Sequence, residues 1–305
     1  GVEKIEDIIG QTQYLEKIQS LDKQYQSIDL SDLIYKDSSL NESFFCTSKK
    51  NNPWDKGLLA KKVLKEAKES IDNEMSTSLN FKISNTDRSI GGSISGYVAN
   101  KYGEPGLINP INLNFTGSAG QSFGCWNANG IQLKVDGDAN DYVGKGMNGG
   151  RIVIRNETPL LASNKETVLV GNTCLYGATG GELYVSGRAG ERFAVRNSGA
   201  SAVIEGSGDH CCEYMTGGQV TVLGSVGANF GAGMTGGFAY VLDEDKSFFD
   251  KCNRGLVNLE RIHTEEMQSH RKHLKETIAE HYRQTNSIKA KELIEDFDRF
   301  EPYFW

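Results

Sequence analysis

The chain has 305 residues, 38% of them hydrophobic, and a formal net charge of −7, which suffices for one large domain or two modest ones. Its basic residues are scattered among acids, which argues against a nucleic-acid surface because phosphate contacts need clustered lysines and arginines. No run approaches the roughly 18 apolar residues of a membrane span, and no basic start with an apolar core opens the chain, so a cytoplasmic protein without membrane contact is expected.

Residues 1–78 are predicted to form an N-terminal segment of helical and irregular structure, because they are polar and poor in glycine. Within this segment, apolar residues recur between Trp54 and Met75 at a spacing of three and four, which predicts one helix that packs on the neighbouring domain. The apolar positions are Leu58, Leu59, Val63, Ala67 and Ile71.

Residues 79–245 are rich in glycine and contain an internal repeat of short strands with period two. The last residues of the six repeated segments are separated by 19, 31, 19, 18 and 19 residues, so one unit of about nineteen residues recurs with one insertion near 159–166. The segments are residues 132–137, 151–156, 182–187, 201–206, 219–224 and 238–243.

Glycine pairs precede four of these segments, at 149–150, 180–181, 217–218 and 236–237, and predict sharp corners of the backbone. A second apolar position lies about six residues before each pair, or before the corresponding place in a repeat unit that has no pair. These positions are Val143, Cys174, Phe193, Cys211 and Phe230.

Alternate residues of the strands are predicted to face inward and to form continuous rows when successive coils stack, while Tyr184 on the other face is expected to be exposed. The inward pairs are Leu133/Val135, Ile152/Ile154, Leu183/Val185, Ala202/Ile204, Val220/Val222 and Ala239/Val241. The predicted fold is therefore mainly β, a right-handed parallel β-helix with helical segments at both ends; propeller, leucine-rich and calcium-binding nonapeptide repeats fit less well.

Residues 246–305 return to a helical pattern and are predicted to be a C-terminal tail that packs on the same domain. The tail ends on Phe300, Tyr303, Phe304 and Trp305, which we expect to be exposed and available to further chain or a partner.

The six cysteines match no zinc or iron–sulfur spacing and are predicted to be buried reduced thiols. Only Cys211 and Cys212 beside His210 suggest a metal site, and adjacent strand residues point to opposite faces, so no metal is predicted.

Seven stretches closely resemble the C-terminal GXGXG domain of glutamate synthase large subunits, and the helical tail at 281–290 (HYRQTNSIKA) resembles that family's ending. The stretches are DRSIGG (87–92), YGEPG (102–106), GSAGQSFG (117–124), GDANDYVGKG (137–146), LYGATGG (175–181), AGERFAVRNSG (189–199) and GDHCCEYMTGG (208–218).

This resemblance implies a structural scaffold that positions two partners in one enzyme, a glutaminase domain and an FMN-binding synthase domain with an iron–sulfur cluster. Together they convert glutamine and 2-oxoglutarate to glutamate with electrons from NADPH, delivered through a small NADPH-oxidising subunit, or from another donor. No catalytic, cofactor-binding or metal residue is expected in this chain, so it should not be catalytic alone. Alternatives are a separately encoded subunit of a split glutamate synthase and a β-helix subunit of another redox complex, such as formylmethanofuran dehydrogenase.

The best candidates for interdomain contacts are Arg188, Arg192 and Arg196. Glu191 with the last two could form an anion site, and Asp209, His210 and Glu213 could form an acid–base group, but polar corner residues more often bind neighbouring coils. The glycines around 144–150 lead into a strand rather than a helix, which favours β-helix corners over a phosphate-binding loop.

Overall fold

The structure, a computed structural model, describes residues 2–17, 29–37, 39, 57–156 and 167–305. The chain separates into two compact units, residues 1–54 and 55–305. The described elements of the first unit bury no side chain; they are the 3-10 helices η1 (Ile5–Ile8) and η2 (Thr12–Tyr14) and the helix α2 (Ser31–Ile34). No helix among the described residues is long and apolar enough to span a membrane.

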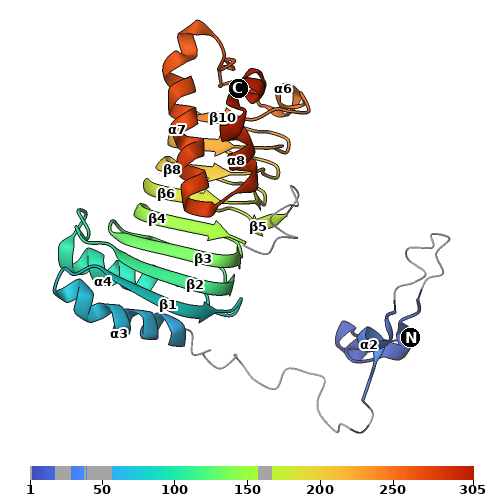
Figure 1. Cartoon of the computed structure of the whole chain (residues 1–305). Helices are drawn as coiled ribbons and strands as arrows, with labels where there is room; N and C mark the ends of the chain where they lie inside the picture. The colour runs from blue at the N-terminus through green and yellow to red at the C-terminus, as the bar shows by residue number, and fades with distance from the viewer. Residues whose placement is uncertain (1, 18–28, 38, 40–56, 157–166) are drawn as a thin grey trace. The chain divides into compact units, whose positions relative to one another are not determined.

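The second unit is built on a ten-stranded parallel sheet with flanking helices. Eight strands stack in the order β1-β2-β3-β4-β6-β8-β9-β10, and the short strands β5 and β7 pair beside them (Figure 1). The strands are β1 (Thr77–Ile83), β2 (Ile111–Ala119), β3 (Ile131–Ala139), β4 (Asn148–Arg155), β5 (Val168–Val170), β6 (Gly180–Val185), β7 (Arg188–Ala189), β8 (Ser198–Ile204), β9 (Thr216–Val222) and β10 (Gly236–Val241).

Two groups of helices flank this sheet. The stretch before β2 holds α3 (Leu58–Asp72) and α4 (Gly92–Tyr102), which lie at the β1 end in Figure 1. The remaining helices follow β10: α6 (Phe248–Lys251), η3 (Glu265–Met267), α7 (Gln268–Thr285), α8 (Ile288–Glu295), α9 (Phe297–Phe300) and η4 (Glu301–Tyr303).

The inward rows of the sheet confirm the predicted repeat. Strand pairing joins Leu133, Ile152 and Leu183 into one row that continues through Ala202 and Val220 to Ala239. The predicted inward residues are all buried except Ala239, which is partly buried against the core.

Two strands, β1 and β2, extend the rows beyond the six predicted segments. Leu79 pairs with Leu113, and Leu113 pairs with Leu133, so the same inward row begins in β1. Helix α4 hides the repeat between β1 and β2, whereas the step from β2 to β3, with Ile111 paired to Ile131, was readable in the sequence and was missed.

The outward row changes character along the stack. It begins with the polar residues Asn80, Asn114 and Lys134 and continues, from β4 onward, with more apolar residues. The later members are Val153, Tyr184, Val203, Thr221 and Tyr240.

Helices α7 and α8 cover this later part of the row and bury a second hydrophobic core, to which Leu274, Ile278 and Leu293 contribute (Figure 1). The prediction that Tyr184 is exposed is therefore wrong: it is 7% exposed and stacks on His281, with 6.1 Å between ring centroids. Loss of solvent raises the pKa of Tyr184 to about 12.

The helix predicted near Trp54–Met75 is confirmed as α3, which buries Val63, Ala67 and Ile71. Its last residue, Asp72, connects α3 to α4, because Lys101 Nζ and Tyr97 Oη of α4 donate to the Asp72 carboxylate at 2.7 and 2.6 Å.

The aromatic C-terminus does not form an exposed cluster. Phe304 is buried and pairs with Leu242, while Trp305 and Val241 exchange both of their backbone hydrogen bonds, at 3.0 and 3.1 Å. The expectation of free aromatics was wrong because residues 303–305 fold back along β10.

The glycine pairs lie at the beginnings of β4, β6, β9 and β10, where the strand register shifts locally. At Gly218, φ is +80°, and a Cβ would approach the carbonyl oxygen of Ala200 to 2.4 Å, so only glycine fits. The predicted insertion at 159–166 lies outside the described residues; the chain after it forms β5.

Candidate interdomain surface

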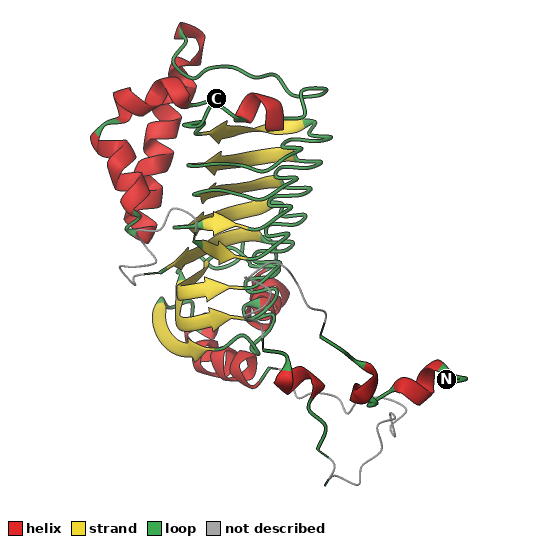
Figure 2. Cartoon of the chain, turned by 90° about the vertical axis from the view of Figure 1, so that its right-hand side faces the viewer, coloured by secondary structure: helices red, strands yellow, loops and turns green. Residues whose placement is uncertain are grey.

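The turns that precede the strands share a five-residue backbone pattern. In each of six turns the first, third and fifth residues have positive φ. These triplets are 122/124/126, 142/144/146, 173/175/177, 192/194/196, 210/212/214 and 229/231/233. The turns stack along one edge of the sheet, as the green loops of Figure 2 show.

Hydrogen bonds between successive turns follow the same alternation. The amides of Arg192 and Arg196 donate forward to carbonyls of Asp209 and Glu213, at 2.8 and 3.0 Å, whereas the amide of Ala194 donates backward to Cys174 at 2.9 Å. This alternation directs the second residue of each turn inward, which is why the predicted apolar row, including Phe193, is buried.

Glycine occupies many of these left-handed positions, as at Gly144 and Gly146, but two consecutive turns contain none. All six left-handed residues in these turns carry side chains: Arg192, Ala194, Arg196, His210, Cys212 and Tyr214. A left-handed conformation costs a non-glycine residue roughly 1 kcal/mol, and such strain tends to persist where the side chain has a use. The outward side chains of these turns are therefore functional candidates.

The outward side chains of the two turns contact one another. Arg192 Nη1 lies 3.9 Å from Glu213 Oε2, and the guanidinium of Arg196 lies 5.9 Å from the ring centre of Tyr214. His210 Nδ1 is also 3.9 Å from Glu213 Oε1. Arg192 and Arg196 are exposed, and Tyr214 is 53% exposed.

Aromatic and basic residues of earlier turns extend this surface. Trp126 is 63% exposed and lies over Gly146, where a Cβ would approach its indole to 3.0 Å. Lys145 Nζ lies 5.2 Å from the ring centre of Tyr142. We call the whole surface the turn face; it consists of Trp126, Tyr142, Lys145, Tyr176, Arg192, Arg196, His210, Glu213 and Tyr214.

The turn face contains two of the three predicted arginines, Arg192 and Arg196. Arg188 lies apart in β7, where its guanidinium donates to Ser225 Oγ at 2.6 Å and to the Ser207 carbonyl at 3.2 Å. Arg188 therefore binds the segments that follow β8 and β9, whereas Arg192 and Arg196 are exposed.

Asp209 does not join His210 and Glu213, because its Oδ1 accepts a hydrogen bond from the amide of Ala228 in the next coil at 2.7 Å. Glu213 lies near Arg192 as well as His210. Gly144 and Gly146 lie in a turn that leads into β4, as expected of a corner rather than a phosphate-binding loop.

The five cysteines that the structure describes are buried and unpaired; Cys46 lies outside the described residues. Burial raises the pKa of Cys174 to about 12 and that of Cys252 to about 11, which makes these thiols poor nucleophiles and ligands. Cys211 and Cys212 both lie in a turn, with their sulfurs 3.8 Å apart. Within the described ranges, no three His, Cys, Asp or Glu residues are grouped so that they could hold a metal ion.

Sequence reasoning missed the aromatic members of the turn face, including Trp126, Tyr176 and Tyr214. A usable signal existed, because the inward residue was identified in five of the six turns, all but Phe123. The residues one before and three after the inward residue, such as Arg192 and Arg196 around Phe193, occupy outward positions. This spacing finds Tyr214 after Cys211 but not Tyr176, which lies two residues after Cys174.

The GXGXG motif family model matches residues 59–305. Over its whole length the chain is 45% identical to a ferredoxin-dependent glutamate synthase of Pyropia yezoensis and 44% identical to ferredoxin-dependent glutamate synthase 2 of Synechocystis. Over 98% of its length it is 41% identical to the glutamate synthase [NADPH] large chain of Bacillus subtilis. It spans only about 20% of each of these curated relatives. The chain therefore belongs to the GXGXG family and is homologous to one part of the glutamate synthase large chain.

Proposed function

We propose that this chain is the scaffold of a glutamate synthase, which holds a glutaminase domain and an FMN-binding synthase domain in a fixed relation. The observation that carries this proposal is the turn face, where strained, outward Arg and Tyr side chains lie on a rigid stack of coils. Tyr, Trp and Arg are the residues that most often dominate protein–protein binding energy. The enzyme as a whole would form glutamate from glutamine and 2-oxoglutarate.

We further propose that the stack is a right-handed parallel β-helix that comprises residues 79–245, between an N-terminal segment (1–78) and a C-terminal tail (246–305). Parallel strands that follow one another in the chain support this winding, because connections between such strands are right-handed in about 98% of cases. Each coil is fixed to its neighbours by backbone hydrogen bonds in both the strands and the turns.

FMN and the iron–sulfur cluster are assigned to the remainder of the enzyme. The described cysteines are buried and do not form a ligand set, so they do not fit a cluster. A ferredoxin or an NADPH-oxidising subunit would supply electrons to the whole enzyme, because relatives are named for each of these two donors. Buried unpaired thiols fit a reducing compartment such as the cytoplasm.

The test replaces the homologous fifth of the Synechocystis enzyme with this chain and measures glutamine-dependent formation of glutamate. The chimera should be active, and changing Arg192, Arg196 and Tyr214 together to alanine should lower the rate at least tenfold. Lys134→Ala, on the polar outward row of β3, is the matched control and should leave the rate within twofold.

Melting curves of the isolated variant chains separate loss of docking from loss of folding. The triple variant should melt within a few degrees of the parent, because its side chains are outward. A triple variant that is folded and as active as the chimera would contradict the role of the turn face.

A further inference from the structure

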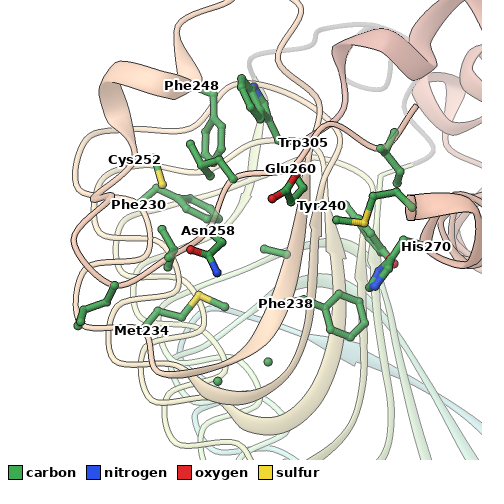
Figure 3. Close-up of a pocket in the computed structure, with 18 of the residues that line it drawn as sticks. Phe230, Met234, Phe238, Tyr240, Phe248, Cys252, Asn258, Glu260, His270 and Trp305 are labelled. Carbon is green, nitrogen blue, oxygen red and sulfur yellow. The ribbon is translucent and has the colours of Figure 1, made fainter. Parts of the chain in front are cut away.

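The last strand of the sheet borders a cavity of about 400 Å³. Figure 3 shows its wall, which is mostly apolar and aromatic and includes Phe230, Met234, Phe238, Tyr240, Phe248 and Trp305. The backbone of β10 from Gly236 to Tyr240 forms one side of this cavity.

One residue of β10 directs its peptide groups into the cavity. Leu242 donates its amide to Val222 of β9 at 2.9 Å, whereas Val241 exchanges both hydrogen bonds with Trp305 on the opposite side. Because the peptide groups of a strand alternate in direction, Ala239 presents its N–H and C=O to the same side as Val241. Residues 303–305 thus cover only the second half of the β10 edge.

The opposite wall of the cavity is an extended segment that also has free backbone groups. Residues 256–261 donate no backbone hydrogen bond within the parts of the chain that the structure describes. Burial alternates along them, with Val257 and Leu259 packed against the core and Asn258 and Glu260 more exposed. Asn258 and Glu260 line the cavity (Figure 3).

We propose that this cleft binds an extended peptide segment of the same enzyme, which adds to β10 as an antiparallel strand and pairs with Ala239. This inference rests on the proposed function, because about four fifths of each relative lies outside the region matched by this chain. An open strand edge is a template for strand addition, and the segment 303–305 already makes the same antiparallel pairing next to it. The apolar wall would receive alternate side chains of the peptide.

Binding is tested on the 305-residue chain with a capped hexapeptide of alternating valine and threonine and with its N-methylated analogue. The unmethylated peptide should shift the Ala239 amide signal in nuclear magnetic resonance spectra, and the analogue should bind at least tenfold more weakly. Equal binding of the two peptides would overturn strand addition.

A pair of variants tests whether the peptide pairs with Ala239. Ala239→Pro removes the donor that faces the cleft but keeps the bonds to β9, so it should stay folded and lose at least tenfold in peptide affinity. Ala239→Ser retains the amide and should bind within threefold of the parent. Unchanged affinity of a folded Ala239→Pro chain would exclude pairing at this residue.

Hydrogen exchange identifies the occupant. The Ala239 amide should exchange rapidly in the isolated chain and slowly in the active chimera. Slow exchange in the dilute isolated chain would show that residues 256–261 close on β10, and protection that grows with chain concentration would indicate a second copy; either result overturns the proposal.

An active chimera with fast exchange at Ala239 overturns this inference alone, whereas an inactive chimera with slow exchange contradicts only the proposed function.

Discussion

Individual side chains in the strand rows are important for stability because each belongs to a row that continues through the neighbouring strands. Val185 is fully buried and pairs with Ile154, whereas Asn80 is exposed at the start of the outward row. Residues with a left-handed backbone conformation, such as Arg192, differ from these strand residues. Their strain lies in the backbone, and the Arg192 side chain is exposed.

The first prediction compares the same substituent at a buried and an exposed strand position. Val185→Asp should lower the free energy of unfolding by at least about 3 kcal/mol, because an unpaired carboxylate enters the core. Asn80→Asp should change it by less than about 0.5 kcal/mol. Urea unfolding measures both values, and similar losses would contradict the assignment of faces.

The second prediction concerns pH and Tyr184. Burial raises its folded-state pKa from 10.0 to about 12, so the folded state holds the proton more tightly than the unfolded state. Its contribution to stability is complete below pH 10 and is lost as the pH rises toward 12. Tyr184→Phe should therefore lose less stability than the parent between pH 8 and pH 11; equal losses in urea unfolding would show that Tyr184 is not shielded by α7.

Among the elements, α7 is important to the sheet because, with α8, it covers the outward row that would otherwise expose apolar side chains. His281 of α7 is fully buried, and its Nε2 lies 3.2 Å from Oε1 of Glu205, which follows β8; Ser287 donates to the same carboxylate oxygen. Asn286 ends the helix in a left-handed conformation. The helix is thus bound to the sheet by an apolar face and by a buried polar group.

A matched pair of substitutions tests this packing. Ile278→Ala in α7 removes a fully buried side chain and should cost about 2–4 kcal/mol of unfolding free energy. Ile288→Ala in α8, where the side chain is 47% exposed, should cost less than about 1 kcal/mol. If thermal unfolding gives equal costs, the second core does not stabilise the fold as described.

On the scale of the whole molecule, both ends of the strand stack are protected in different ways. Helix α3 contacts β1 and packs on α4, whereas the segment 303–305 pairs with half of the β10 edge. A stack with long open edges would associate with other chains. Protected ends and an exposed turn face suit a platform on which other domains assemble.

The purified chain is expected to be folded but to form no glutamate from glutamine and 2-oxoglutarate when FMN and a reductant are supplied. Glutamine hydrolysis needs an activated nucleophile, whereas the described cysteines are buried, and burial raises the pKa of the Cys174 and Cys252 thiols. Product formation by chromatographic assay, abolished by Cys211→Ser or His210→Ala, would make the domain a catalyst and refute the scaffold proposal.

The sequence by itself determined the repeated strands and their inward rows, because a buried strand face imposes alternation that is readable in residues such as Leu183 and Val185. It also located α3, whose apolar spacing is strictly local. Arg192 and Arg196 were candidates for interdomain contacts from the sequence, and that role stays a prediction.

Only the tertiary structure decided what covers the outward face, since the alternation in β6 looks the same whether Tyr184 meets water or α7. The same holds for Trp305, whose partner Val241 is distant in sequence, and for Arg188, which is held by Ser225 of a later coil. Local sequence patterns specify which side of an element is apolar, whereas contacts between distant segments depend on how the elements pack.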